Sequence, residues 1–274
     1  MHTDIKPLQN ELRVMLKEFI NCCEQNGLCY YLFYGTLLGA VRHEGFIPWD
    51  DDIDLLMPRR DIERFVSLYG QYYSESAHLD GYNCSKYDSF APNIRICSDK
   101  MYLCQRRNGK DEYINAFLSI WIIDGLPDNK VKCKYHLKRV FRKYAFLRLS
   151  RSSIQGVRDI AHRSLKERMI IKLNSLLQFG RIISPRYAAK KFNETLKKYP
   201  LEQGECCFIG WNPKGKRVFR TEWFQSSIQA KFDGLLCNIP CGYDQILKLE
   251  YGDYMKLPPI NRQQPSHSLK YVII

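Results

Sequence analysis

The sequence predicts an α+β fold, and two observations indicate it. Helix-like and strand-like patterns alternate over roughly the first 130 residues and return in the last quarter, whereas the stretch between them has a helical pattern alone. Of the 274 residues, 45% are hydrophobic, which is enough to bury a core in one large domain or two modest ones. We expect a globular chain in three parts: residues 1–128, residues 129–200 and residues 201–274.

The chain is expected to begin with a helix followed by two strands. A helix over residues 5–25 is predicted because apolar residues recur at spacings of three and four: Leu8, Leu12, Met15, Leu16 and Phe19. The aromatic-rich residues 28–34 favour a strand that ends at Gly35 and Thr36, where a second helix begins. Residues 53–57 favour another short strand, which a proline stops.

Three further elements precede the central segment. Residues 59–69 again have helical periodicity, and residues 91–97 have the composition of a strand. Residues 116–123 form an unbroken apolar run, which is typical of a strand in the middle of a sheet. The last quarter of the chain mixes strand and turn composition.

The positive charge of the chain is concentrated in its centre. Residues 130–200 contain 20 Lys and Arg but only three acids, whereas the rest has 22 basic and 26 acidic residues, and the net charge is +13. Asp128 is expected to cap a helix that begins near Lys130, and Ser184 with Pro185 marks a second helix start. Residues 162–179 carry an apolar stripe opposite Lys and Arg.

Such a segment can bind nucleic acid or an anionic membrane. No nucleic-acid-binding sequence pattern is found, so we expect no nucleic acid partner. Basic amphipathic helices more often lie on anionic membrane surfaces, and this is the partner we expect for residues 130–200.

The cysteines and the N-terminus indicate a cytoplasmic protein. The 11 cysteines are scattered and odd in number, and no pair has metal-ligand spacing, so we expect reduced and mostly buried thiols. No signal-peptide core and no run of about 18 apolar residues is present. We therefore expect neither export nor a membrane span.

Four aspartates within five residues mark the candidate site: Asp50, Asp51, Asp52 and Asp54. On a strand, residues i and i+2 point to one face about 6.5 to 7 Å apart, so Asp52 and Asp54 are the predicted metal ligands and catalytic residues. Hard oxygen ligands at this spacing suit Mg²⁺, with Mn²⁺ as an alternative. Asp50 and Asp51 are expected to shape the loop. The competing interpretation is a solvated acidic turn.

A phosphate-binding turn is predicted close to the aspartates. Gly35 and Thr36 stand where a strand ends and a helix begins, a geometry that offers backbone N–H groups to an anion. A phosphate site and an Asp-x-Asp pair within twenty residues of each other are typical of nucleotide-dependent transfer chemistry.

The stretch "YGTLLGAVRHEGFIPWDDDIDLLMPRRD" closely resembles the signature of the LicD family, which includes bacterial phosphocholine transferases and is related to fukutin-type transferases. Supporting matches are found at residues 122–127, 231–247 and 251–259, whereas the basic segment is the least similar part. The resemblance implies a nucleotidyltransferase-like fold, with a small mixed sheet flanked by helices. The outer two parts of the chain would then form one catalytic domain, with the basic helices as an insertion.

The resemblance also implies an activity. A phosphorylated small alcohol, most simply phosphocholine, would move from a CDP-linked donor to a sugar hydroxyl, releasing CMP. The acceptor would be a lipid-linked cell-surface glycan such as a teichoic acid or lipopolysaccharide precursor, at the inner face of the cell membrane. Gly35 and Thr36 would contact the donor phosphates, and Arg42 and His43 could add positive charge there, although His43 could instead be structural.

This chain departs from the family pattern at one position. Ser119 stands where members commonly have an aspartate expected as a third metal ligand. Asp124, five residues further on, would lie on the opposite face of a regular strand. We expect Asp124 to be structural or to bind the donor. Another acid could replace the missing ligand, the site could work with one fewer charge, or activity could be lost.

Aromatic side chains are candidates for binding a quaternary ammonium group. Trp49, directly before the aspartates, is the candidate that we single out. Core packing is the expected role of most others near the motifs: Tyr30, Tyr31, Tyr34, Trp211 and Trp223. The alternatives that stay open are transfer of ribitol phosphate, glycerol phosphate or phosphoethanolamine, and a catalytically weakened accessory protein that binds a glycan or nucleotide.

Overall fold

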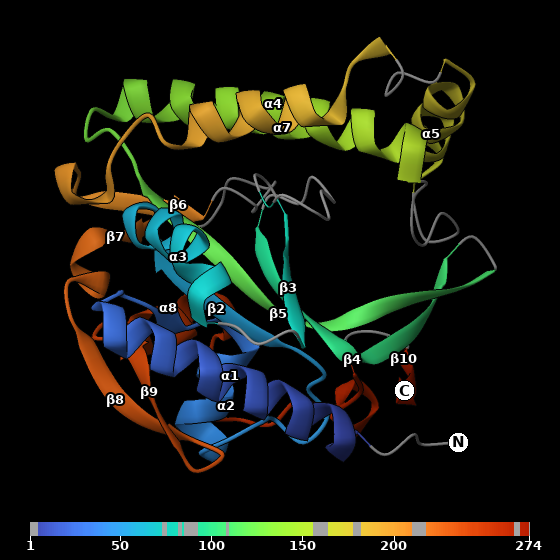
Figure 1. Cartoon of the computed structure of the whole chain (residues 1–274). Helices are drawn as coiled ribbons and strands as arrows, with labels where there is room; N and C mark the ends of the chain where they lie inside the picture. Colours follow the sequence, from blue (N-terminus) through green and yellow to red (C-terminus); the bar gives the residue numbers. More distant parts are fainter. Residues whose placement is uncertain are drawn as a thin grey trace.

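A mixed β-sheet with helices packed around it forms the body of the protein (Figure 1). The structure, a computed structural model, describes residues 5–72, 76–81, 84, 93–107, 110–155, 164–177, 182–209, 218–265 and 269–273. Within these residues, eight strands belong to the main sheet and two more form a separate hairpin. The predicted α+β class is confirmed.

The helices and strands alternate along the outer parts of the chain. The helices are α1 (Lys6–Asn26), α2 (Tyr34–His43), α3 (Arg59–Tyr72), α4 (Lys130–Gln155), α5 (Leu165–Leu177), α7 (Pro185–Leu196) and α8 (Tyr243–Tyr251). The strands are β1 (Tyr31–Leu32), β2 (Ile53–Pro58), β3 (Ala77–Asp80), β4 (Ile94–Arg107), β5 (Lys110–Gly125), β6 (Cys206–Ile209), β7 (Val218–Arg220), β8 (Ser227–Phe232), β9 (Leu235–Pro240) and β10 (Leu269–Ile273).

The sheet is mixed because one central pair of strands is parallel. β2 runs parallel to β5, whereas β1 pairs with β2, and β4 with β5, in the antiparallel sense. β3 and β10 pair with β4, and β6 extends the other end of β5 towards β7. β5 therefore lies at the centre, as its unbroken apolar run predicted.

The two faces of the central strands differ in chemistry. Leu55 of β2 is aligned with Ile120 of β5, both are fully buried, and α1 and α3 contact these strands. On the alternate positions, Asp54 of β2 is aligned with Ser119 of β5, so these side chains point to the opposite face. The face that carries Asp54 and Ser119 is thus polar at this point, although Leu56 and Ile123 further along the same face are fully buried.

The N-terminal helix agrees with its predicted pattern. Its stripe of apolar residues is at most 3% exposed: Leu8, Leu12, Met15, Leu16 and Phe19. The helix ends at Gly27, whose φ of 58° lies in the left-handed region, and the Gly27 N–H donates to the carbonyl of Cys23. A glycine adopts this conformation without the steric cost that other residues incur.

The expected strand over residues 28–34 is shorter than predicted. Only Tyr31 and Leu32 pair with β2, and the Phe33 N–H then donates to the carbonyl of Asp54 at 2.9 Å. Tyr34 follows with a φ of 43° and opens α2. The aromatic composition that favoured a strand instead fills the core, where Tyr30 and Phe33 are 1% and 0% exposed.

The start of α4 also differs from the expectation. Asn129, not Asp128, caps this helix: its Oδ1 accepts hydrogen bonds at 3.0 Å from the N–H groups of Val131 and Lys132. Asp128 instead accepts from the Glu205 N–H at 2.8 Å. The helix that begins at Pro185 is confirmed, with Ser184 at its N-cap.

α4 and α7 lie side by side across one end of the sheet (Figure 1). Between them is a second apolar cluster, separate from the main core, in which the rings of Tyr144 and Phe192 are 5.6 Å apart. None of the helices in the described ranges has a stretch that is long and apolar enough to cross a bilayer. All 11 cysteines are free thiols and most are buried, as predicted.

Asp124 of β5 is linked through Arg59 to the two helices α3 and α7. It is 2% exposed, and both of its oxygens accept from Arg59 of α3, from Nε at 2.5 Å and from Nη2 at 2.7 Å. The remaining arm of the guanidinium donates to Asn193 Oδ1 of α7 at 2.7 Å. Asp124 thus lies on the α3 side of the sheet, opposite to Ser119, and its contacts are those of a structural residue.

We predict that Asp124→Ala lowers the free energy of unfolding by about 3 kcal/mol, because it leaves the Arg59 guanidinium buried without its carboxylate. Urea denaturation measures the change. The matched control is Glu194→Ala, which removes one partner of the exposed Lys191–Glu194 pair and should have a much smaller effect. Unchanged stability together with a raised KM for a donor substrate would instead assign Asp124 to the donor site.

Candidate active site

The candidate site lies where the acidic loop before β2 meets the first turn of α2. Asp54 is on β2, and its backbone N–H donates to Oγ1 of Thr36 at 2.9 Å. The Phe33 N–H donates to the Asp54 carbonyl, so both sides of the Asp54 backbone are tied to the start of α2. Gln9 of α1 fixes the loop from the other direction, donating from Nε2 to the carbonyl of Asp50 at 3.0 Å.

Three consecutive carboxylates gather in this loop. One oxygen from each of Asp50, Asp51 and Asp52 lies within 4.8 Å of the other two, and Asp51 is only 3% exposed. The sequence had predicted Asp52 and Asp54 as the metal ligands, with Asp50 and Asp51 shaping the loop. The structure brings Asp50 and Asp51 into the same cluster as Asp52, and Asp54 is not a member of that close group.

Asp54 nevertheless belongs to the same electrostatic site. Burial and the negative charges of Asp52 and Asp50 raise the pKa of Asp54 well above its usual value. The indole Nε1 of Trp121 donates to Asp54 Oδ1 at 2.7 Å. This hydrogen bond and the positive charge of Arg95 favour the ionised carboxylate and so offset part of the increase in the pKa. A cation bound here would relieve the repulsion among these carboxylates.

The first turn of α2 approaches the acidic cluster closely. A Cβ atom on Gly35 would lie 2.8 Å from Oδ2 of Asp50, so the absence of a side chain allows this approach. Thr36 is 2% exposed and its hydroxyl oxygen is engaged by the Asp54 N–H, although the hydroxyl proton can still be donated. The predicted phosphate turn therefore borders the predicted metal site.

Arg42 and His43 lie at the other end of α2. Ten residues of helix place them roughly 12 Å from Gly35 along the axis. Arg42 donates from Nη1 to the carbonyl of Tyr254 at 2.7 Å and so holds the segment after α8 against α2. Burial and the charge of Arg42 lower the pKa of His43, which favours the neutral imidazole. The contacts of Arg42 and His43 with a donor therefore stay predictions.

Aromatic residues besides Trp49 also lie near the aspartates, and the role of Trp49 in binding an ammonium group stays a prediction. Trp49 is half-buried and packs against the main core. Tyr34 and Trp121 form an edge-to-face pair with centroids 6.0 Å apart, and Trp121 bonds to Asp54. Tyr251, at the end of α8, is 43% exposed, and desolvation of its hydroxyl together with the charges of Asp54 and Asp50 raises its pKa.

Most other aromatic residues have the structural role that was expected. Tyr30 and Tyr31 are buried, and the Tyr31 hydroxyl donates to the carbonyl of Phe224 at 2.5 Å. Trp223 packs against the core beside Gly242. Trp211 lies outside the described residues.

Ser119 is in the position that the family pattern predicted for a third carboxylate. It is aligned with Asp54 on the neighbouring parallel strand and is 4% exposed. On the other side of β5, Ser119 is aligned with Arg95 of β4. A hydroxyl therefore stands between a carboxylate and a guanidinium on the polar face of the sheet.

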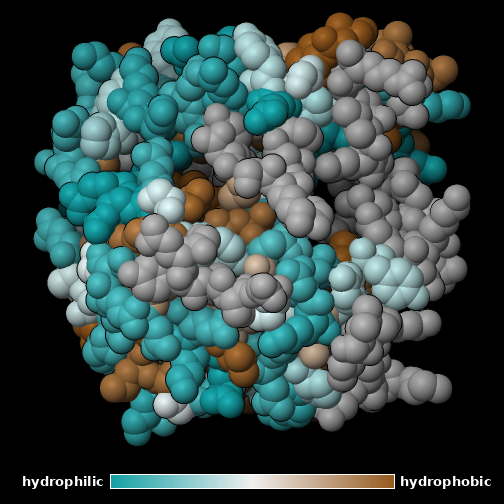
Figure 2. Space-filling model, in the orientation of Figure 1, coloured by the Kyte–Doolittle hydropathy of each residue, from teal (hydrophilic) through white to brown (hydrophobic). Residues whose placement is uncertain are grey.

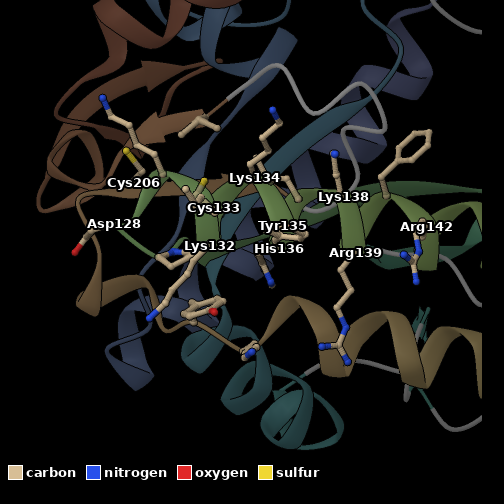
Figure 3. A pocket seen from close by; sticks show the side chains of 18 of the residues that line it. Asp128, Lys132, Cys133, Lys134, Tyr135, His136, Lys138, Arg139, Arg142 and Cys206 are labelled. Carbon is tan, nitrogen blue, oxygen red and sulfur yellow. The ribbon is translucent and has the colours of Figure 1, made fainter.

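The basic N-terminal half of α4 lines a broad hollow, but it is not one closed pocket (Figure 3). Residues 130–139 all line it, yet Lys134 and Lys138 extend to one side of the helix and Lys132 and Arg139 to the other. No single ligand can contact both sides of a helix at once. We interpret this region as a solvated basic surface, separate from the acidic cluster.

The residues at the acidic cluster fit a divalent metal ion. Several carboxylate oxygens converge, and hard oxygen ligands are those that Mg²⁺ and Mn²⁺ prefer. The residues able to hold it are Asp50, Asp51 and Asp52, with Asp54 beside them.

Sequence comparisons with known proteins identify the family of this chain. The family model described as "LicD/FKTN/FKRP, nucleotidyltransferase domain" matches residues 27–158. The Haemophilus influenzae protein named lipopolysaccharide cholinephosphotransferase LicD is 32% identical over 260 residues, which is 92% of each chain. A human protein named ribitol 5-phosphate transferase FKRP is 39% identical over 59 residues, 22% of this chain and 12% of its own length. The chain belongs to the LicD family.

Proposed function

We propose that this protein is a phosphotransferase that moves phosphocholine from CDP-choline to a sugar hydroxyl of a cell-surface glycan precursor. The family relationship supports a phosphotransferase, and the similarity to the H. influenzae protein over 92% of both chains supports phosphocholine as the group that is moved. The observation that carries the proposal is the acidic cluster of Asp50, Asp51 and Asp52 against the first turn of α2. It combines a cation site with backbone N–H groups suited to phosphate.

In this reaction the acceptor hydroxyl oxygen attacks the phosphorus of the choline phosphate group. The bond from that phosphorus to the bridging oxygen breaks, CMP leaves with the electron pair, and the hydroxyl proton passes to a base. Mg²⁺, or Mn²⁺, held by the aspartates would neutralise charge on the donor diphosphate. The N–H groups at Gly35 and Thr36 would orient the diphosphate.

Aromatic groups beside the acidic cluster support a cationic alcohol. Tyr34 and Trp121 present ring faces and edges next to Asp54, and Tyr251 approaches from α8. A quaternary ammonium over such rings gains roughly 0.5 to 2 kcal/mol. Trp49, which like Tyr34 and Trp121 is partly buried against the core, stays a candidate for this contact.

Two other functions have specific support. Transfer of ribitol phosphate is favoured by the match to the protein named ribitol 5-phosphate transferase, over 22% of this chain, and transfer of glycerol phosphate or phosphoethanolamine stays open beside it. A catalytically weakened accessory protein that binds a glycan or nucleotide is favoured by Ser119 in place of a third carboxylate.

We further propose that the acceptor is lipid-linked and that the protein attaches to the inner face of the cell membrane through residues 130–200. The support is α5, which presents a row of exposed apolar side chains that are 57–76% exposed: Leu165, Met169, Leu173 and Leu176. Figure 2 shows apolar surface in the region of α5 at the upper right. Three basic side chains of α5 are also exposed: Lys166, Arg168 and Lys172. An exposed apolar row with a basic rim suits an anionic bilayer surface.

We predict that the purified protein releases CMP from CDP-choline when Mg²⁺ and a glycan acceptor are present. Asp52→Ala should lower kcat/KM by about 100-fold or more, because a metal ion supplies several kcal/mol of charge stabilisation. Glu24→Ala, which removes an exposed carboxylate from α1, is the matched control and should retain activity.

A panel of donors separates the alternatives. A preference for CDP-ribitol or CDP-glycerol would support the phosphoalditol function, whereas absence of release from every donor, with a competent acceptor present, would support the accessory function.

We also predict that the protein pellets with anionic vesicles in preference to neutral ones at physiological salt. Met169→Gln with Leu173→Gln should reduce pelleting severalfold, because it removes apolar surface from the centre of the α5 row. The control, Leu257→Gln with Ile260→Gln, changes two apolar residues that are 52% and 86% exposed elsewhere. Equal partitioning of wild type into both kinds of vesicle would contradict the proposal.

A further inference from the structure

A row of three side chains crosses the polar face of the sheet beside the acidic cluster. Asp54 of β2 is aligned with Ser119 of β5, and Ser119 is aligned with Arg95 of β4. Aligned residues on neighbouring strands point to the same face, and the strands are about 4.8 Å apart. The Cα atom of Arg95 is thus roughly 10 Å from that of Asp54, within the combined reach of the two side chains.

Arg95 packs against an aromatic ring, and one of its N–H groups has no partner within the described residues. Its Cζ lies 4.2 Å from the centroid of the Phe117 ring. Phe117 precedes Ser119 by two residues on β5 and therefore lies on the same face of the sheet. The Arg95 Nε is buried and has no hydrogen-bond partner within the described residues. Asp80 of β3 is aligned with Arg95, yet no ion pair within 4.0 Å joins Arg95 to a carboxylate in the described part of the chain.

This arrangement is unusual for an arginine in a sheet. A buried N–H without a partner is costly, so a guanidinium kept in such a place is expected to meet an acceptor from a ligand. Its forked donors match the oxygens of a phosphate group, which can accept two parallel hydrogen bonds. The nearest expected ligand is the diphosphate of a nucleotide at the acidic cluster.

We propose that Arg95 binds the donor phosphates directly, with Ser119 as a neighbouring hydroxyl donor. This inference rests on the proposed function, because it places the diphosphate between the metal ligands and Arg95. It also assigns a purpose to Ser119. A carboxylate at position 119 would stand next to Arg95 and pair with the guanidinium, whereas a serine leaves those donors available to phosphate. The site then has one carboxylate fewer than the family pattern, and the guanidinium of Arg95 stands beside the serine.

The competing explanation is that Arg95 only stabilises the sheet and keeps Asp54 ionised from a distance. Measuring nucleotide binding in the presence of Mg²⁺ distinguishes the two, because CDP carries the phosphates and cytidine does not. Isothermal titration calorimetry with CDP, and with cytidine as the phosphate-free reference, requires no turnover.

We expect Arg95→Gln to weaken CDP binding about 10- to 100-fold while leaving cytidine binding unchanged, as for loss of a charge-assisted hydrogen-bonding group. Arg95→Lys should restore part of the difference, because it returns the charge without the fork. Arg220→Gln, which changes an arginine 66% exposed at the far edge of the sheet, is the matched control.

Ser119→Asp gives a second and opposite test. If Arg95 binds the phosphates, CDP binding should be weaker in this variant, because the new carboxylate forms an ion pair with the Arg95 guanidinium. If Ser119 instead marks the place of a missing third metal ligand, the new aspartate should complete the metal site and tighten the binding of Mg²⁺ and CDP. That result would overturn the inference. Thermal melting checks that each variant is folded, and if Arg95→Gln is not, Arg95→Lys and Ser119→Asp decide.

The failures of the two proposals are distinguishable. Mg²⁺-dependent CDP binding that requires Arg95, without CMP release from any donor, would refute the transferase function and retain the Arg95 assignment. CMP release with CDP affinity unchanged in Arg95→Gln would refute the Arg95 assignment and retain the function. A wild-type protein that does not bind CDP would refute both.

Discussion

The parallel pairing of β2 with β5 is the constraint on which the rest of the site depends. Leu55 and Ile120 are fully buried beneath α1 and α3, and a shift of β2 by one residue would turn Leu55 away from these helices and Asp54 towards them. The same register aligns Asp54 with Ser119 and brings the acidic loop to the start of α2. Packing on one face of the sheet thus determines the chemistry of the other.

The parts of the fold that depend on local patterns could be predicted from the sequence. The 3.6-residue period of α1 and the unbroken apolar run of β5 identify both elements, and the aspartates before β2 identify the site. Arg95 could not be found in this way, because its place next to Ser119 follows from long-range strand pairing. Trp121 could have been found, since it follows Ser119 by two residues on the same face of a strand.

Other features depend on tertiary contacts that compete with local preference. The charges of Asp54 and Asp50 act on the pKa of Tyr251 only because α8 follows them in space, which Arg42 supports by holding the segment after α8. Asp128 and Asn129 are both residue types that commonly cap helices. Asn129 caps α4 because the Asp128 carboxylate accepts a hydrogen bond from the Glu205 N–H instead. The exposed apolar row of α5, next to the basic α4, is a surface of the described residues that supports the proposed membrane attachment.

The central claim is that the acidic cluster holds a metal ion that meets the donor diphosphate. The most direct test is a crystal structure with CDP-choline and Mn²⁺ in place of Mg²⁺, in which anomalous scattering locates the metal. We expect the anomalous peak at the carboxylates of Asp52 and its neighbours, with the diphosphate between that peak and the side of the sheet that carries Arg95. A metal and diphosphate bound elsewhere, for example along the basic surface of α4, would contradict the account.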